Sequence, residues 1–95
     1  MEEYQYTYES TQTIEKRVHV GVVGSGDAEI LMEPANTSSV TVKTNVEGFK
    51  NLWEDVLQRF MEEADVCAQI EIHDFGATPG VIRLRLQQAL EEAKS

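Results

Sequence analysis

Two alternating apolar segments flank the tripeptide Gly24-Ser25-Gly26, and their numbering constrains how the chain folds there. Side chains alternate between the two faces of a strand, so residues at every second position share a face. The apolar residues on both sides of the tripeptide are even-numbered, so if they share a face of an antiparallel pair, facing residues have numbers with an even sum and the connection has an odd number of residues. The pattern therefore predicts a β-hairpin with a three-residue loop, and the apolar residues on its shared face are Ile14, Val18, Val20, Ala28, Ile30 and Met32.

This hairpin predicts a register and an exposed serine. Glycine on both sides of Ser25 allows positive φ and removes side chains that would crowd its hydroxyl. We therefore expect Ser25 at an accessible tip, with Asp27 orienting the loop. An ordinary Gly-Ser-Gly turn without a function is the alternative. In the predicted register Val20 lies opposite Ile30, Val18 opposite Met32 and, on the other face, Arg17 opposite Glu33.

The periodicity of the remaining chain predicts an α+β fold. After a polar turn at Pro34–Ser39, the order is strand, helix, strand and helix, and the strand–helix–strand unit implies a right-handed crossover if the two strands are parallel neighbours. We expect one domain over residues 1–95, in two layers, with residues 1–12 frayed. Its order is ββ(β)αβα, a four-stranded mixed, mostly antiparallel sheet with both helices on one face. The apolar positions are Val40, Val42 and Thr44 in the third strand; Phe49, Leu52, Trp53, Val56, Leu57, Phe60, Met61 and Ala64 in the first helix; Ala68, Ile70 and Ile72 in the fourth strand; and Ile82, Leu86, Ala89, Leu90 and Ala93 in a last helix that Thr78 caps before Pro79.

Composition restricts the function. The 95 residues carry a net charge of −9, with no basic stripe that could follow phosphates, which argues against nucleic-acid binding and favours docking on basic surfaces. No apolar run approaches the roughly 20 residues that span a bilayer, and the polar start is unlike a signal peptide, so we expect a cytoplasmic protein that does not bind membranes. Cys67 is the only cysteine, and at a strand start it is expected to be a small buried residue.

A second segment, His73–Gly80, joins a strand end to a helix start. The N–H groups of such a helix start can hold an anion, although a capped turn that packs tightly is the alternative. A serine hydrolase is disfavoured because its elbow needs glycine two residues either side of the serine, where Val23 and Asp27 stand. A metal site has little support, since His19 and His73 lie far apart in sequence without a third ligand at the usual spacing.

The segments Gly21–Leu31 and Ile72–Val81 together resemble the acyl carrier (delta) subunit of malonate decarboxylase. The resemblance runs from about Val18 to the C-terminus and is weakest in the first dozen residues and the middle helix. It implies that Ser25 bears 2'-(5''-phosphoribosyl)-3'-dephospho-CoA, a phosphoribosyl-dephospho-coenzyme A arm, through a phosphodiester. Gly24, Gly26 and Asp27 would form the surrounding loop, and the thiol of the arm would carry acetyl or malonyl.

The resemblance also implies partners. These are the acyl-carrier transferase and decarboxylase subunits of the complex, and the transferase that attaches the prosthetic group; the chain itself would catalyse neither acyl step. Two alternatives remain open from the sequence: an acyl carrier of the citrate lyase type, and a small ligand-binding or regulatory module, because a sheet with two helices serves many purposes. A covalent group on one serine would exclude the second alternative.

Overall fold

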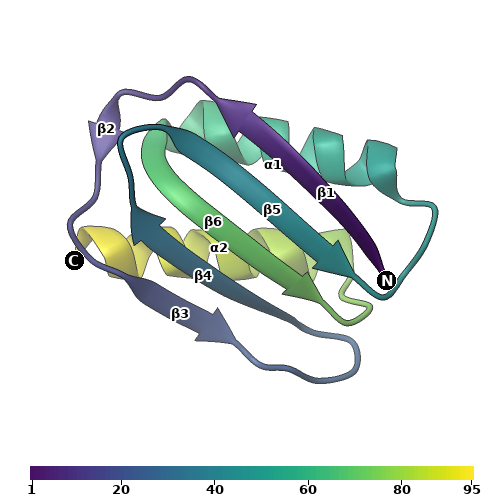
Figure 1. Ribbon diagram of the computed structural model, residues 1–95. Helices are drawn as coiled ribbons and strands as arrows, with labels where there is room; N and C mark the ends of the chain where they lie inside the picture. The colour runs from purple at the N-terminus through teal and green to yellow at the C-terminus, as the bar shows by residue number, and fades with distance from the viewer.

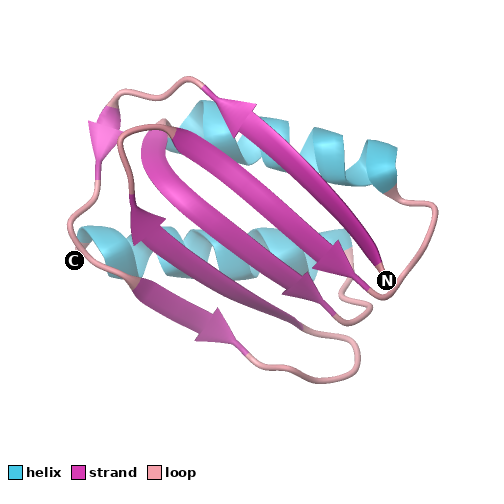
Figure 2. Cartoon of the chain, viewed as in Figure 1, coloured by secondary structure: helices cyan, strands magenta, loops and turns pink.

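The computed structural model covers residues 1–95 and contains a six-stranded sheet backed by two helices (Figure 1). Along the sheet the strands follow the order β1-β5-β6-β4-β3, and β2 pairs with β6 outside that path. Both helices lie on the same face (Figure 2). This confirms the α+β class and the one-sided helical layer, with six strands in place of four. The elements are β1 (Glu2–Tyr8), β2 (Gln12–Thr13), β3 (Val18–Gly21), β4 (Ala28–Pro34), β5 (Ser38–Thr44), α1 (Lys50–Ala64), β6 (Val66–Asp74) and α2 (Pro79–Lys94).

The β3–β4 hairpin has the predicted register. Val20 pairs with Ile30 and Val18 with Met32. On the opposite face the Arg17 Nε lies 3.2 Å from the Glu33 Oε1. The numbering of apolar residues was therefore sufficient to align these strands.

The hairpin loop is longer than the predicted three residues, since residues 22–27 separate β3 from β4. Gly21 ends β3 with a φ of 84°, a conformation that turns the chain away from the extended ladder. A Cβ at Gly21 would lie 2.0 Å from the Ala28 carbonyl oxygen, so only glycine fits there. The strands therefore separate before they reach Gly24.

The N-terminal residues do not fray, which corrects the expectation for residues 1–12. β1 pairs antiparallel with β5 from Glu2 opposite Thr44 to Tyr8 opposite Ser38. Aromatic residues at every second position favour a strand, and Tyr4, Tyr6 and Tyr8 pack half-buried against the core. β2 adds a short parallel contact to the start of β6, where Cys67 is buried as predicted.

The core lies between the sheet and the helices. β5 and β6 are parallel neighbours joined through α1, and α2 begins with the predicted Thr78 cap, whose Oγ1 accepts from the Val81 N–H at 3.3 Å. All five predicted apolar positions of α2 are buried. In α1 the prediction is wrong for Phe49 and Leu52, which are 47% and 40% exposed because they border a cavity at the start of the helix.

Candidate functional site

Three connections meet at one end of the sheet, after β3, β5 and β6 (Figure 1). The first is the Ser25 loop, residues 22–27. A turn closes it, with the Asp27 N–H donating to the Gly24 carbonyl oxygen at 3.1 Å. Gly26 has a φ of 79°, and a Cβ built there would meet nothing within 4 Å. Ser25 is exposed, as the flanking glycines predict.

Backbone hydrogen bonds join the Ser25 loop to the turn after β6. The Gly26 N–H donates to the Phe75 carbonyl oxygen at 2.8 Å, and the Phe75 N–H donates to the Asp27 carbonyl oxygen at 3.0 Å. The two segments that carry the family resemblance are therefore in direct contact. This reciprocal pair favours a supporting role for the His73–Gly80 turn over an independent anion site.

Asp27 connects the same loop to α2. The Arg85 Nε donates to Asp27 Oδ1 at 3.1 Å, and Nη2 donates to Oδ2 at 2.7 Å, a bidentate pair. These hydrogen bonds, followed by one from the Ala28 N–H, hold the pKa of Asp27 below its usual value. Arg85 was missed from sequence, although its position three residues after the buried Ile82 places it beside the apolar stripe.

The turn after β6 is held by a buried acid. Asp74 is 4% exposed. Its Oδ2 accepts from the Thr44 hydroxyl at 2.8 Å, and its Oδ1 accepts from the Ala77 N–H at 2.9 Å. Gly76 follows with a φ of 89°. One side chain thereby joins the end of β5, the end of β6 and the turn that supports the Ser25 loop.

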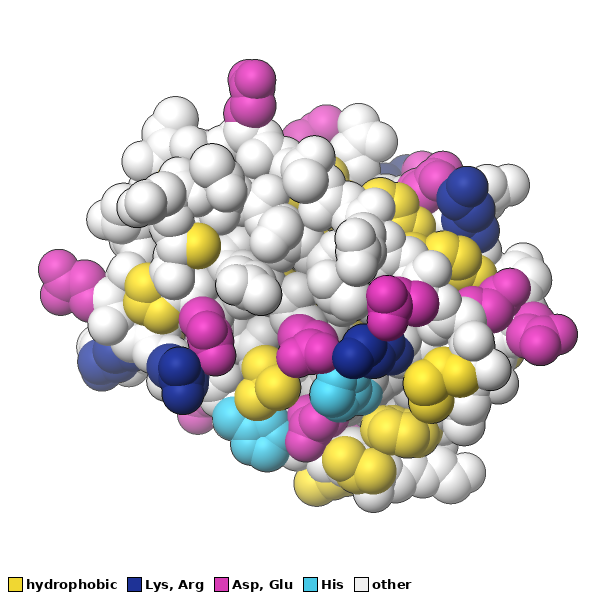
Figure 3. All heavy atoms as spheres, in the orientation of Figure 1, with side chains coloured by type: hydrophobic (Ala, Val, Ile, Leu, Met, Phe, Trp, Pro, Cys, Tyr) yellow, Lys and Arg dark blue, Asp and Glu magenta, His cyan; other side chains and the backbone are white.

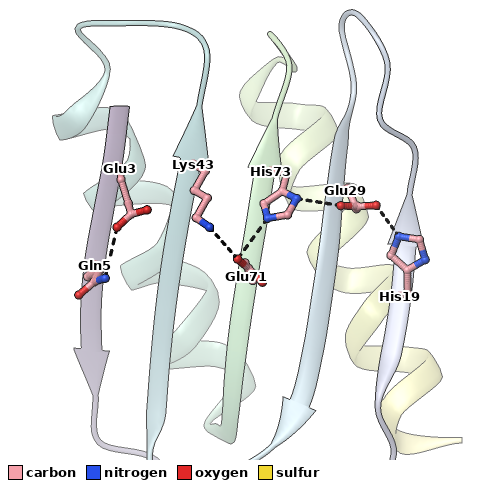
Figure 4. Close-up of polar contacts among 7 residues, drawn as sticks. All are labelled: Glu3, Gln5, His19, Glu29, Lys43, Glu71 and His73. Atoms are coloured by element: carbon pink, nitrogen blue, oxygen red, sulfur yellow. Dashed lines mark hydrogen bonds and ion pairs between the residues drawn. The ribbon is translucent and has the colours of Figure 1, made fainter. Parts of the chain in front are cut away.

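The uncovered face of the sheet carries a row of ionisable side chains near this end (Figure 4). β3, β4 and β5 supply one each and β6 supplies two. His19 Nε2 and His73 Nδ1 lie 2.9 and 2.8 Å from the two oxygens of Glu29. Glu71 Oε1 lies 3.2 Å from His73 Nε2 and 3.3 Å from Lys43 Nζ. Both histidines are visible on this face in the space-filling view, with acidic side chains beside them (Figure 3).

The structure thus brings together two histidines that are far apart in sequence. Hydrogen bonds from His19 first, and then from His73, hold the pKa of Glu29 below its usual value. The His73 contact is the main cause of the lowered pKa of Glu71. The side chains form a row across the strands and do not converge on one point as metal ligands do.

Fold and site together define a two-layer α+β protein that holds one exposed serine on a loop supported by a turn that the buried Asp74 anchors. No helix is both long and apolar enough to cross a membrane. The model of the family described as malonate decarboxylase delta subunit (MdcD) matches residues 15–93. The chain belongs to this family, whose members are acyl carrier proteins of malonate decarboxylase.

Curated relatives match over the full chain. The malonate decarboxylase acyl carrier protein of Stutzerimonas stutzeri is 45% identical, over 97% of this chain and 96% of the relative. That of Azotobacter vinelandii is 44% identical over 100% and 99%. That of Pseudomonas aeruginosa strain PAO1 is 46% identical over 98% and 97%.

A solved structure matches equally well. A chain in the crystal structure of a Pseudomonas malonate decarboxylase hetero-tetramer in complex with malonate superposes with a TM-score of 0.92. The two chains are 42% identical, and the match covers 98% of this chain and 99% of the other. Sequence and fold therefore place the chain in the same family.

Proposed function

We propose that this chain carries acetyl and malonyl units for malonate decarboxylase on a phosphoribosyl-dephospho-coenzyme A arm attached to Ser25. The observation that supports this most directly is the position of Ser25, exposed at the tip of a glycine-flanked loop. When bound, the arm supplies a thiol that holds the acyl unit as a thioester. Family membership favours this cargo over that of a citrate lyase carrier.

The residues around Ser25 fit such an attachment. In the attachment reaction the Ser25 Oγ forms a bond to the phosphorus of a triphosphate-activated group, the hydroxyl proton is lost and pyrophosphate leaves. A separate transferase must approach the hydroxyl in line, and the open space at Gly26 leaves room for it. Asp27 is hydrogen-bonded to Arg85, so the base of the loop stays in place while the transferase acts on Ser25 at the tip.

A covalent arm suits a protein that serves several enzymes. Tethering keeps the acyl unit at a high effective concentration for each partner in turn. The proposed partners are the acyl-carrier transferase and decarboxylase subunits, in line with the hetero-tetramer in which the structural relative was solved, together with the prosthetic-group transferase. We place the protein in the cytoplasm with them, and its own residues take no part in either acyl step.

Intact-mass measurement tests the proposal. Coexpression with the modifying enzymes should add one covalent group, and peptide mapping should place it on Ser25. The Ser25→Ala protein should keep the unmodified mass, support no malonate decarboxylation in the reconstituted complex and melt like the wild type, because an exposed loop hydroxyl contributes little to stability. Ser95→Ala, at the exposed C-terminus, is the control that should still be modified.

Two results would contradict the proposal. One is a modified peptide containing Ser10, Ser38, Ser39 or Ser95 in place of Ser25. The other is a Ser25→Ala complex with full activity. An unchanged mass after coexpression would favour the small ligand-binding module instead.

A further inference from the structure

A cavity of about 200 Å³ opens at the end of the molecule that holds Ser25. It lies between the start of α1, the connection after β5 and the turn after β6. Apolar side chains form most of its wall. Phe49 and Leu52 also line the cavity and are exposed to solvent. Its walls include Val46, Trp53, Val56, Ala77 and Ile82.

The cavity and the Ser25 loop share a wall. Gly76 and Ala77 line the cavity, and Phe75, the residue before them, exchanges two hydrogen bonds with the loop. A Cβ built on Gly76 would lie 4.0 Å from the Gly26 nitrogen. Ser25 is bonded to that nitrogen through its own carbonyl carbon. The attachment residue therefore lies next to the cavity wall, and the arm brings its acyl end to the cavity by folding back toward Ser25.

The size and polarity of the cavity select what can enter. A dry cavity of about 150 Å³ accommodates benzene, so this space is sufficient for an acetyl thioester and the methylenes next to its sulfur. The wall contains no basic residue. Its one acidic side chain, Asp74, presents oxygens that already accept hydrogen bonds from Thr44 and Ala77. A carboxylate buried there would be unpaired and would lie beside these acceptor oxygens, which is strongly unfavourable.

We propose that this cavity holds the acetyl-thioester end of the arm and excludes the malonyl-thioester end. The inference rests on the proposed function, since it needs the arm on Ser25. Burying the acetyl form in the cavity shields its thioester from water. The malonyl form stays in solvent, where a partner enzyme can take it. The same carrier thus stores one acyl group and presents the other.

Trp53 provides a direct readout, because it is the only tryptophan of the chain and lines the cavity. The carrier is prepared in its unmodified, free-thiol, acetyl and malonyl forms, each verified by intact mass. We expect the acetyl form alone to shift the Trp53 emission. Without partner subunits, the acetyl carrier should hydrolyse roughly 10-fold more slowly than free acetyl-coenzyme A, which corresponds to about nine-tenths occupancy of the cavity. The malonyl carrier should hydrolyse at the rate of free malonyl-coenzyme A.

Variants that fill the cavity, compared with a variant on the exposed surface, test whether the cavity causes both readouts. Val56→Phe fills the cavity from a half-buried position in α1, and Val46→Phe fills it from the connection after β5 should the first variant fold poorly. Either change should abolish the emission shift and restore the hydrolysis rate of the free thioester. Leu84→Phe is the matched control, because Leu84 is 64% exposed on α2 and does not line this cavity; it should change neither readout.

The outcomes distinguish this inference from the proposed function. A mass without the arm, or an arm mapped to another serine, overturns both. A carrier correctly modified on Ser25 that gives equal emission in all forms, or equal hydrolysis on and off the carrier, overturns only the cavity. A malonyl form that shifts emission as strongly as the acetyl form overturns the selectivity.

Discussion

The Ser25 loop and the turn after β6 lie against each other, yet they are held in different ways. The turn is anchored by the buried Asp74 side chain, which joins it to the end of β5. The loop has no buried side chain of its own between Val22 and Gly26. It is attached through two backbone bonds to Phe75 and through the Asp27–Arg85 pair.

The two regions therefore have different roles: the turn after β6 is the support, and the loop presents Ser25. A serine that an external enzyme must reach needs a tip with open space around it, and exposed loops with few buried contacts open at low free-energy cost. The tip must also return to one position if several partners are to find it. The neighbouring turn, anchored by the hydrogen bonds of the buried Asp74, provides that position. Changes in the turn should therefore lower stability, whereas changes in the loop should lower modification.

Removing the buried acid should have the largest effect on stability. Asp74→Ala removes the acceptor of the buried Thr44 hydroxyl and of the half-buried Ala77 N–H, at a cost of about 1–3 kcal/mol for an unsatisfied buried group. For a domain of this size each kcal/mol corresponds to roughly 4–8 °C in Tm. Thermal unfolding followed by circular dichroism measures the loss. Asp27→Ala is the matched change in the loop, and a fall in Tm as large as that of Asp74→Ala would contradict the comparison.

Gly76→Val should weaken both regions together. A β-branched residue at a φ of 89° is strained by about 1–3 kcal/mol, and the turn that pairs with the loop is displaced with it. Both Tm and the rate of attachment to Ser25, followed by intact mass, should fall. Gly80→Ala is the control, because a Cβ at Gly80 meets only ordinary contacts in α2. Unchanged melting with lost attachment would indicate that the modifying enzyme recognises the turn directly.

Arg85→Ala should affect the loop with little effect on the core. The loop loses its only side-chain connection to α2, so Ser25 samples more positions and attachment should slow by roughly 10-fold, while Tm changes little. Arg83→Ala, an exposed arginine on the same helix, is the control and should be modified at the wild-type rate. Equal attachment rates for the two variants would show that the Asp27–Arg85 pair is not needed to position Ser25.

Salt should have the smallest effect, on association alone. The net charge of −9 and the acids Asp27 and Glu29 near the loop favour steering toward basic patches on the partner subunits. Screening acts over roughly 8 Å at physiological ionic strength, so raising the salt should slow association and leave dissociation nearly unchanged. Stopped-flow or surface-based kinetics over a salt series measures both rates. An association rate independent of salt would refute steering.

Local patterns were sufficient for much of the fold. Alternation around Ser25 predicted the β3–β4 register, and the helical stripe predicted every buried position of α2. The same reasoning failed for β1, because its alternating tyrosines are only half-buried and fall outside a clean apolar pattern. It also failed for Phe49 and Leu52, which the helical period places on the buried stripe but which border the cavity at the start of α1.

For the site, the sequence by itself determined the exposed position of Ser25 and the residues that carry the family resemblance. These depend on glycine geometry and on neighbours in the chain, which are local properties. Only the tertiary structure decided what supports the serine. Arg85 lies 58 residues from Asp27, and Phe75, which pairs with Gly26, is also far from it in the sequence. Such pairs form because strands and helices pack in one particular order, and no local period encodes which distant side chains that order brings into contact.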